Sequence, residues 1–232
     1  MKKLRDLRVE FDERLQGYEI PAFRGALIEK VGREHILFHH HINNNSFLNK
    51  YPLIQYKHIR NQPALICLEE GADEIHNFFN QKDWNINIKG RDLNLKIDNL
   101  KVQQYNMQVW NKTFNYAIYK WMALNQDNYR KYNEMDGLSD RIQFLEKTMR
   151  GHILSFAKGI EWHIDKKFEI KITDIINTKW VNLKDQRVLA FDLNFQTNIF
   201  IPDYVGIGKS ASIGFGVIKH YFENKNKQNK ND

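Results

Sequence analysis

The amino-acid sequence predicts an α+β protein built from two tandem ferredoxin-like (RRM-like) domains. Short stretches of alternating apolar and polar residues indicate strands, and a few segments with apolar residues three or four positions apart indicate helices. In the first half these elements follow the order strand, helix, strand, strand, helix, strand, which is the ferredoxin-like unit. The second half repeats that layout with a strand, helices, further strands and a final strand, although no sequence repeat relates the two halves.

The patterns in the first half place each element in turn. Leu7 and Val9 alternate with charged residues, as in a half-buried first strand, and Pro21 begins a helix over residues 22–30 that Gly32 ends. The remaining elements are expected as strands at 35–41, 51–57 and 64–68, a short helix at 71–79, and strands at 84–88 and 93–97 joined by a hairpin turn. Together they make an N-terminal domain of residues 1–99.

The second half contains two stretches with helical spacing. In residues 113–125 and 138–157 apolar residues recur every three or four positions, which predicts two helices with core-facing stripes. Strands are expected at 102–110, 168–176, 180–183, 188–201 and 213–221. Residues 100–222 then form the C-terminal domain. Residues 223–232 contain no apolar side chain and are expected to be disordered.

The composition favours a soluble protein with an anionic partner. Hydrophobic residues make up 42% of the 232 and aromatic residues 13%, which excludes a disordered chain. Lys and Arg number 35 against 28 Asp and Glu, and this net charge of +7 favours nucleic acid or a membrane surface. The single cysteine, Cys67, allows no internal disulfide, and no apolar run approaches the ~20 residues of a membrane span. We therefore expect a cytoplasmic protein.

A glycine-rich stretch near the end of the chain is a candidate phosphate-binding loop. Residues 206–216 contain four of the 12 glycines, together with one lysine and two serines. Glycine permits close backbone approach to a ligand, and exposed amides beside a lysine can hold phosphate oxygens. The spacing differs from that of the P-loop and of the dinucleotide-binding loop. A mobile turn between two strands is the alternative interpretation.

Three adjacent histidines, His39, His40 and His41, are the candidate proton-transfer groups. Histidine can both accept and donate a proton near neutral pH. On an extended chain residues 39 and 41 share a face, so His39 and His41 would form a pair. Structural histidines in a solvated loop are the alternative. The sequence contains no motif that would supply the further ligands of a zinc ion, so no metal or cofactor is expected.

Four motifs occur in an order that resembles a known family. They are Phe38-His-His-His41, Tyr51-Pro-Leu-Ile-Gln-Tyr-Lys57, Gly151-His-Ile-Leu-Ser-Phe-Ala-Lys-Gly159 and the terminal glycine loop. The set is similar to the CRISPR-associated endoribonucleases of the Cas-six type, in the RAMP superfamily, and to their branch with two active-site histidines. The resemblance covers nearly the whole chain. It implies metal-independent cleavage of precursor CRISPR RNA within its repeats by 2′-hydroxyl attack, leaving 5′-hydroxyl and 2′,3′-cyclic phosphate ends.

The resemblance also implies roles for individual residues. His39 and His41 would be the catalytic pair, although His40 leaves open which two histidines form it. Tyr51 would supply an assisting hydroxyl, or would pack at the start of a strand. The residues expected to hold the RNA backbone are Lys57, Gly206, Gly208, Lys209, Ser210, Gly214 and Gly216.

The implied partner is CRISPR repeat RNA, with no membrane, and the sequence leaves open a CRISPR effector complex and a homodimer. A catalytically inactive RNA-binding subunit of such a complex is the alternative function. A metal-dependent phosphodiesterase is a third interpretation.

Overall fold

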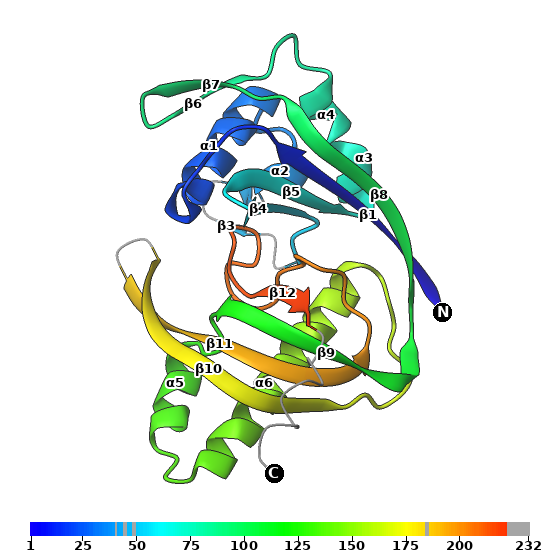
Figure 1. Cartoon of the computed structure of the whole chain (residues 1–232), viewed down its shortest axis with the longest axis vertical. Helices are drawn as coiled ribbons and strands as arrows, with labels where there is room; N and C mark the ends of the chain where they lie inside the picture. The colour runs from blue at the N-terminus through cyan, green and yellow to red at the C-terminus, as the bar shows by residue number, and fades with distance from the viewer. Residues whose placement is uncertain (40, 44–45, 48–49, 184–185, 222–232) are drawn as a thin grey trace, which may run out of the picture.

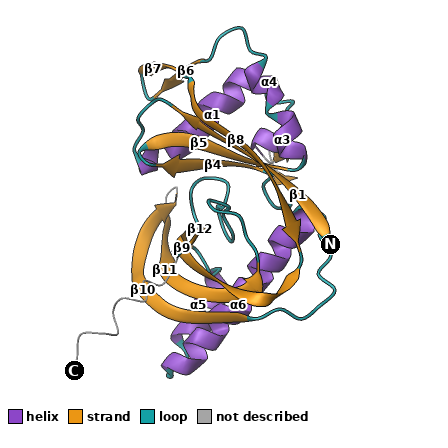
Figure 2. Ribbon diagram, turned by 45° about the vertical axis from the view of Figure 1, so that its right-hand side comes forward, coloured by secondary structure: helices purple, strands orange, loops and turns teal. Residues whose placement is uncertain are grey.

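The computed structural model describes residues 1–39, 41–43, 46–47, 50–183 and 186–221, and for 41–43 and 46–47 it describes the backbone alone. The predicted tail at 223–232 lies outside these residues. Two four-stranded antiparallel sheets dominate the structure, one in each half of the chain (Figure 1). The loop that precedes the last strand lies between the two sheets (Figure 2).

The first sheet has the strand order of the ferredoxin-like fold. Its strands are β4 (Ile54–Ile59), β5 (Gln62–Leu68), β1 (Lys2–Phe11) and β8 (Ile97–Met107), in that spatial order. Helices α1 (Ile20–Val31), α3 (Glu70–Glu74) and α4 (His76–Phe79) cover one face of this sheet (Figure 1). A core of buried side chains from α1, α4 and the sheet, including Val9, Phe23 and Phe78, fills the space between them.

The second sheet repeats this order. Its strands are β10 (Ile170–Leu183), β11 (Gln186–Ile199), β9 (Val109–Trp121) and β12 (Val217–His220), and its helices are α5 (Gln126–Asn133) and α6 (Leu138–Gly159). The apolar stripe predicted for residues 138–157 is confirmed, since Leu145, Met149, Ile153 and Phe156 are fully buried. The predicted architecture of two tandem ferredoxin-like domains is therefore confirmed.

One predicted helix is wrong. Residues 113–125 do not form a helix, because most of them belong to β9, which pairs with β11 and β12. Tyr116 and Ile118 are buried in strand alternation, and then the register shifts at Lys120, whose φ is +51°. This bulge places Trp121 back on the buried face. The shifted alternation produced the three- and four-residue spacing that looked helical.

The strand predicted at residues 35–41 is also wrong. The chain forms one turn, α2 (Ile36–His39), followed by β2 (His41–Asn43), which pairs with β3 (Ser46–Phe47). Of residues 36–39 only Phe38 is buried, and a single turn suffices to bring one side chain into the core.

The remaining short elements are η1 (Gly17–Glu19), β6 (Asn85–Ile88) and β7 (Arg91–Asn94), the last two forming the predicted hairpin.

A second hydrophobic core joins the two halves. It contains Leu4, Leu53 and Ile66 from the first half and Phe156 and Ile207 from the second half, all buried together. The chain passes from the first sheet to the second at residue 108, so the boundary expected between residues 99 and 100 falls inside β8.

Within the described residues no helix is both long enough and apolar enough to cross a membrane.

Candidate functional site

The histidine segment starts on α2 and is attached to the edge of the first sheet. The carbonyl oxygen of buried Phe38 accepts a hydrogen bond of 3.1 Å from the hydroxyl of Tyr56 on β4. The Nε2 atom of His39 lies 2.7 Å from the carbonyl oxygen of Arg33, and the Arg24 guanidinium donates to the His39 carbonyl. The backbone at Phe38 and His39 is therefore held by contacts from α1 and β4, and the His39 side chain contacts the preceding turn.

The three adjacent histidines do not share one extended strand. His39 ends α2, whereas His41 begins β2, where its backbone pairs with Phe47. His40 and the side chain of His41 lie outside the described residues. His39 and His41 therefore do not lie on one extended strand, as the sequence pattern had indicated. The catalytic pair stays a prediction from the resemblance. Among the side chains that the structure describes, no group of three or more His, Cys, Asp or Glu is placed to hold a metal ion.

Tyr51 lies between the two halves of the protein, 7% exposed. Its hydroxyl donates to the carbonyl oxygen of Gly206 at 2.6 Å and accepts from Nε2 of Gln55 at 2.6 Å. Its ring packs edge-on against Phe156 of α6, with ring centroids 5.3 Å apart. Burial raises the pKa of this phenol far above its ordinary value, so it stays neutral. Tyr51 thus connects β4, α6 and the glycine loop.

Lys57 supports the glycine loop from inside the protein. Its side chain is fully buried, and Nζ donates a hydrogen bond of 2.7 Å to the carbonyl oxygen of Ala211. Desolvation lowers the pKa of Lys57 from its usual 10.5 to about 7. Since Nζ has no access to solvent here, Lys57 fixes the loop backbone, and its contact with RNA stays a prediction.

This burial predicts a pH dependence of stability. Below about pH 7 Lys57 is protonated in both the folded and the unfolded state, so the cost of burying the charge is fully present. Between pH 7 and its ordinary pKa near 10.5 the unfolded state binds more protons, so the folded protein gains stability as pH rises. Relative to Lys57→Met, the wild-type free energy of unfolding should rise by up to about 1.4 kcal/mol per pH unit from pH 7 to 9.

Urea unfolding of both proteins at pH 6, 7, 8 and 9 measures this difference. Because Lys57→Met keeps a long side chain without a charge, it serves as the reference at each pH. Parallel stability curves for the two proteins between pH 7 and 9 would contradict the predicted protonation change.

Three of the four loop glycines pack against the protein itself. A Cβ atom on Gly206 would lie 2.6 Å from Nζ of Lys57, and one on Gly208 would lie 2.9 Å from both Nδ1 of His152 and Nε1 of Trp121. A Cβ on Gly216 would collide with the carbonyl of Ile207, and Gly208 and Gly216 have φ values of +85° and +59°. These glycines therefore let the loop fit between the two halves.

The middle of the loop is the part open to a ligand. Lys209 is exposed and Ser210 partly exposed, and around Gly214 a Cβ would find its nearest atom only at 4.0 Å. The backbone N–H groups from Gly208 to Ala211 have no hydrogen-bond acceptor among the described residues. By contrast, the amides of Gly206 and Gly216 donate to Gln55 Oε1 and the Lys120 carbonyl. An anion would thus find donors at residues 208–211.

Tyr56 connects this loop to the histidine segment. Its backbone N–H donates to the carbonyl oxygen of Ser212 at 2.7 Å, and its side-chain hydroxyl donates to the carbonyl oxygen of Phe38 at 3.1 Å. Ile213 also forms an isolated parallel bridge with Tyr56. Phe38, which precedes the histidines, and Ser212 and Ile213, which follow Lys209 and Ser210 in the loop, therefore contact one tyrosine at the edge of β4.

His152 was not predicted as a site residue, although it lies beside the loop. Its Nδ1 atom accepts a hydrogen bond of 3.0 Å from Nε1 of Trp121, and the two rings pack edge to face. Desolvation lowers the pKa of His152 to about 4, so the ring is neutral at pH 7. Sequence offers one signal: His152 lies next to Ile153 and three residues after Met149, so a polar ring falls on the buried side of α6.

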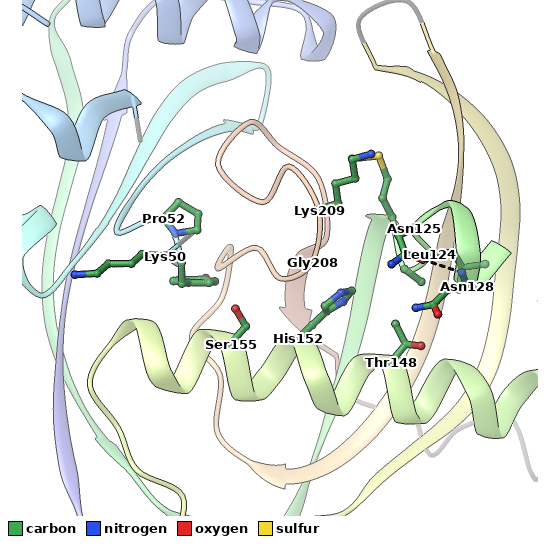
Figure 3. Close-up of a pocket in the computed structure, with 13 residues that line it drawn as sticks. Lys50, Pro52, Leu124, Asn125, Asn128, Thr148, His152, Ser155, Gly208 and Lys209 are labelled. Carbon is green, nitrogen blue, oxygen red and sulfur yellow. Dashed lines mark hydrogen bonds between the residues drawn. The ribbon is translucent and has the colours of Figure 1, made fainter. Parts of the chain in front are cut away.

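A cavity of about 420 Å³ lies between α6, the end of β9, the start of α5 and the glycine loop. Thr148, His152 and Ser155 point up from α6 toward the loop, and Lys209 lies on the opposite side (Figure 3). The other residues of the lining are Lys50, Tyr51, Pro52, Met122, Ala123, Leu124, Asn125, Asn128 and Gly208. The cavity therefore adjoins the loop amides, which makes this the candidate binding region.

Comparison with known proteins places the whole chain in one family. Residues 2–106 match the model of the Cas6b N-terminal domain, and residues 108–221 match that of the Cas6b C-terminal domain. A protein of Methanocaldococcus jannaschii, MJ0978, is 32% identical over 136 residues, which span 55% of this chain and 91% of that protein.

Solved structures give the same result. The chain is similar to a crystal structure of Cas6b with a TM-score of 0.86 and 27% identity, over 95% of this chain and all of the other. It is also similar to the crystal structure of the CRISPR RNA processing endoribonuclease Cas6b, with a TM-score of 0.73, 25% identity and the same coverage. The two domain matches and these two structures agree over the length of the chain, and the protein belongs to the Cas6b family.

Proposed function

We propose that this protein cleaves precursor CRISPR RNA within its repeats, by attack of a ribose 2′-hydroxyl on the adjacent phosphate. As a member of the Cas6b family, the chain is an endoribonuclease. Such a reaction needs a base for the 2′-hydroxyl, stabilisation of the negative charge on the phosphorane, and an acid for the 5′-oxygen. The products carry 5′-hydroxyl and 2′,3′-cyclic phosphate ends.

The arrangement around Tyr56 is the observation that supports this mechanism best. It brings Phe38, which precedes His39, and the loop residues Ser212 and Ile213 to the same edge of the first sheet. We assign the proton transfers to His39 and His41 and the contacts with phosphate oxygens to the loop amides and Lys209. Lys57, Gly206 and Gly216 fix the loop from behind. Tyr51 positions Gly206 through its hydroxyl.

This mechanism predicts cleavage without a divalent cation. Two histidines can carry out both proton transfers, so repeat RNA from a CRISPR array beside the gene should be cut at an unchanged rate in excess EDTA. Gel analysis of end-labelled RNA, with and without EDTA, measures the rate. Complete loss of cleavage with EDTA and its recovery with added Mg²⁺ or Mn²⁺ would favour the metal-dependent phosphodiesterase.

The alternative of a catalytically inactive RNA-binding subunit gives a different outcome. Such a protein would bind the repeat RNA but leave it intact under every condition. A binding measurement on the same RNA, made beside the cleavage assay, distinguishes this protein from an enzyme that was given the wrong repeat.

A further inference from the structure

The cavity beside the glycine loop has a lining that suits an anionic ligand. Lys209 lies at one end and Lys50 at the other, and neither forms an ion pair among the described residues. None of the thirteen lining residues is Asp or Glu. A neighbouring cavity of about 390 Å³ shares Lys50, Tyr51 and Ser155 with it. That cavity differs in charge, because Glu69, Glu70 and Glu161 line it together with Lys2, Arg5 and Lys158. The distribution of charge therefore directs a phosphate-bearing ligand to the cavity at the loop.

The lining also provides an apolar surface between the two cationic ends. Pro52 is partly exposed and presents an apolar ring to the cavity, whereas Met122 and Leu124, which follow the end of β9, are buried and close its wall. Flat apolar and aromatic surfaces hold unstacked RNA bases. A volume of about 420 Å³ lies at the small end of the range for ligand pockets and accommodates a single nucleotide rather than a helix.

The structure shows which polar atoms of the lining can donate a hydrogen bond to a ligand. Because Nδ1 of His152 accepts from the Trp121 indole, the ring hydrogen resides on Nε2, which is a donor with no acceptor among the described residues. Asn125 Oδ1 is occupied by the amide of Asn128, whereas the side-chain amide of Asn128 makes no such bond within the described chain. These groups can read the edge of a base. The His152 donor requires an acceptor on that edge.

We infer that this cavity binds one unpaired nucleotide of the RNA, with its base against Pro52 and its flanking phosphates near Lys209 and Lys50. The inference rests on the proposed function, since it names the part of the RNA that this region recognises. His152 donates from Nε2 to an acceptor on the base. The nucleotide held there is fixed relative to the glycine loop, so it sets the register of the RNA at the edge of β4.

The inference is tested by measuring RNA affinity for one change in the RNA, one change in the protein, and the two changes combined. The first change is in the RNA, where each unpaired nucleotide of the repeat is replaced in turn by an abasic residue. The second change is Ser155→Trp, which fills the cavity from an exposed position on α6. Leu154→Trp is the matched control, because Leu154 is the preceding residue, is 46% exposed and does not line the cavity.

We expect one abasic position to weaken binding to the wild-type protein by about 10- to 100-fold, the range for loss of a stacked base. Ser155→Trp should weaken binding of intact RNA to a similar extent, and the abasic RNA should lose little more with this variant. Leu154→Trp should bind like the wild type. Losses that multiply, or the absence of any sensitive unpaired position, would overturn the inference.

The outcome is separable from that of the proposed function. If the wild-type protein cuts the repeat, but the affinity losses from the abasic RNA and from Ser155→Trp multiply, only the inference about the cavity is refuted. If the two affinity losses do not multiply and the protein does not cut the repeat, the proposed cleavage is refuted and the inference about the cavity stands. Circular dichroism melting of both tryptophan variants checks that they are folded.

Discussion

Replacing His41 by alanine is expected to slow cleavage of repeat RNA by about 10²–10⁴-fold, the usual contribution of a general acid or base. His39→Ala should have a similar effect, because the proposed mechanism needs one group to accept and one to donate a proton. RNA affinity should change little for either variant, since neither histidine is assigned to hold the backbone. Single-turnover cleavage rates and filter binding on the same preparations measure the two quantities separately.

His40→Ala is the control for this prediction, and it should slow cleavage least. Equal losses for all three variants, accompanied by lower melting temperatures, would show that the segment is structural. The Arg33 carbonyl can only accept, so Nε2 of His39 carries a ring hydrogen in this contact, and proton transfer at that nitrogen would require it to release the carbonyl. Hydrogen bonds of catalytic groups often take their final form only when substrate binds, so this contact is compatible with the proposed role.

The tandem fold was predictable because most elements have a clear period. Strand alternation in β1 and β11 and the apolar stripe of α6 each show which face is buried. The pattern failed at β9, where the bulge at Lys120 shifted the alternation by one residue. A bulge depends on pairing with β11 and β12, which are more than 60 residues away in the sequence. Local periodicity could not reveal it.

The glycine-rich stretch forms a loop in the structure, and its glycines have more than one role. Sequence alone shows that residues 206–216 are rich in glycine, and a ligand was the expected reason. In the structure Gly206 meets Lys57 of β4, Gly208 meets His152 of α6, and Gly216 meets Ile207 across the loop itself. Lys57 was expected to hold the RNA backbone, whereas it is buried below the loop. The contacts with Lys57 and His152 depend on the packing of segments that are far apart in the sequence.

The same reason explains why His152 was missed. The motif from Gly151 to Gly159 was recognised as a segment, but nothing in it assigns a partner to the histidine. The partner, Trp121, lies 31 residues earlier, in the segment that looked like a helix. Once β9 is a strand, its Trp121 reaches α6, and the cavity forms between them. An error in one element therefore concealed part of the binding region.

In the proposed mechanism the RNA supplies its own nucleophile. A repeat RNA with a single 2′-deoxyribose immediately before the cleaved phosphate lacks the attacking hydroxyl, and all other contacts with the protein can still form. Cleavage at that position should be abolished, at least 10³-fold slower than in the unmodified RNA, since no other group in the mechanism replaces the 2′-oxygen. Binding should remain nearly unchanged.

The measurement compares cleavage of the deoxy-substituted and unmodified repeat RNAs under single-turnover conditions, with analysis of the product ends. A deoxy substitution one nucleotide further upstream is the control and should be cut at the normal rate. The proposed mechanism predicts a blocked deoxy substrate and a 2′,3′-cyclic phosphate on the product of the unmodified RNA. Cleavage of the deoxy substrate at the normal rate would require water as the nucleophile and would contradict the mechanism.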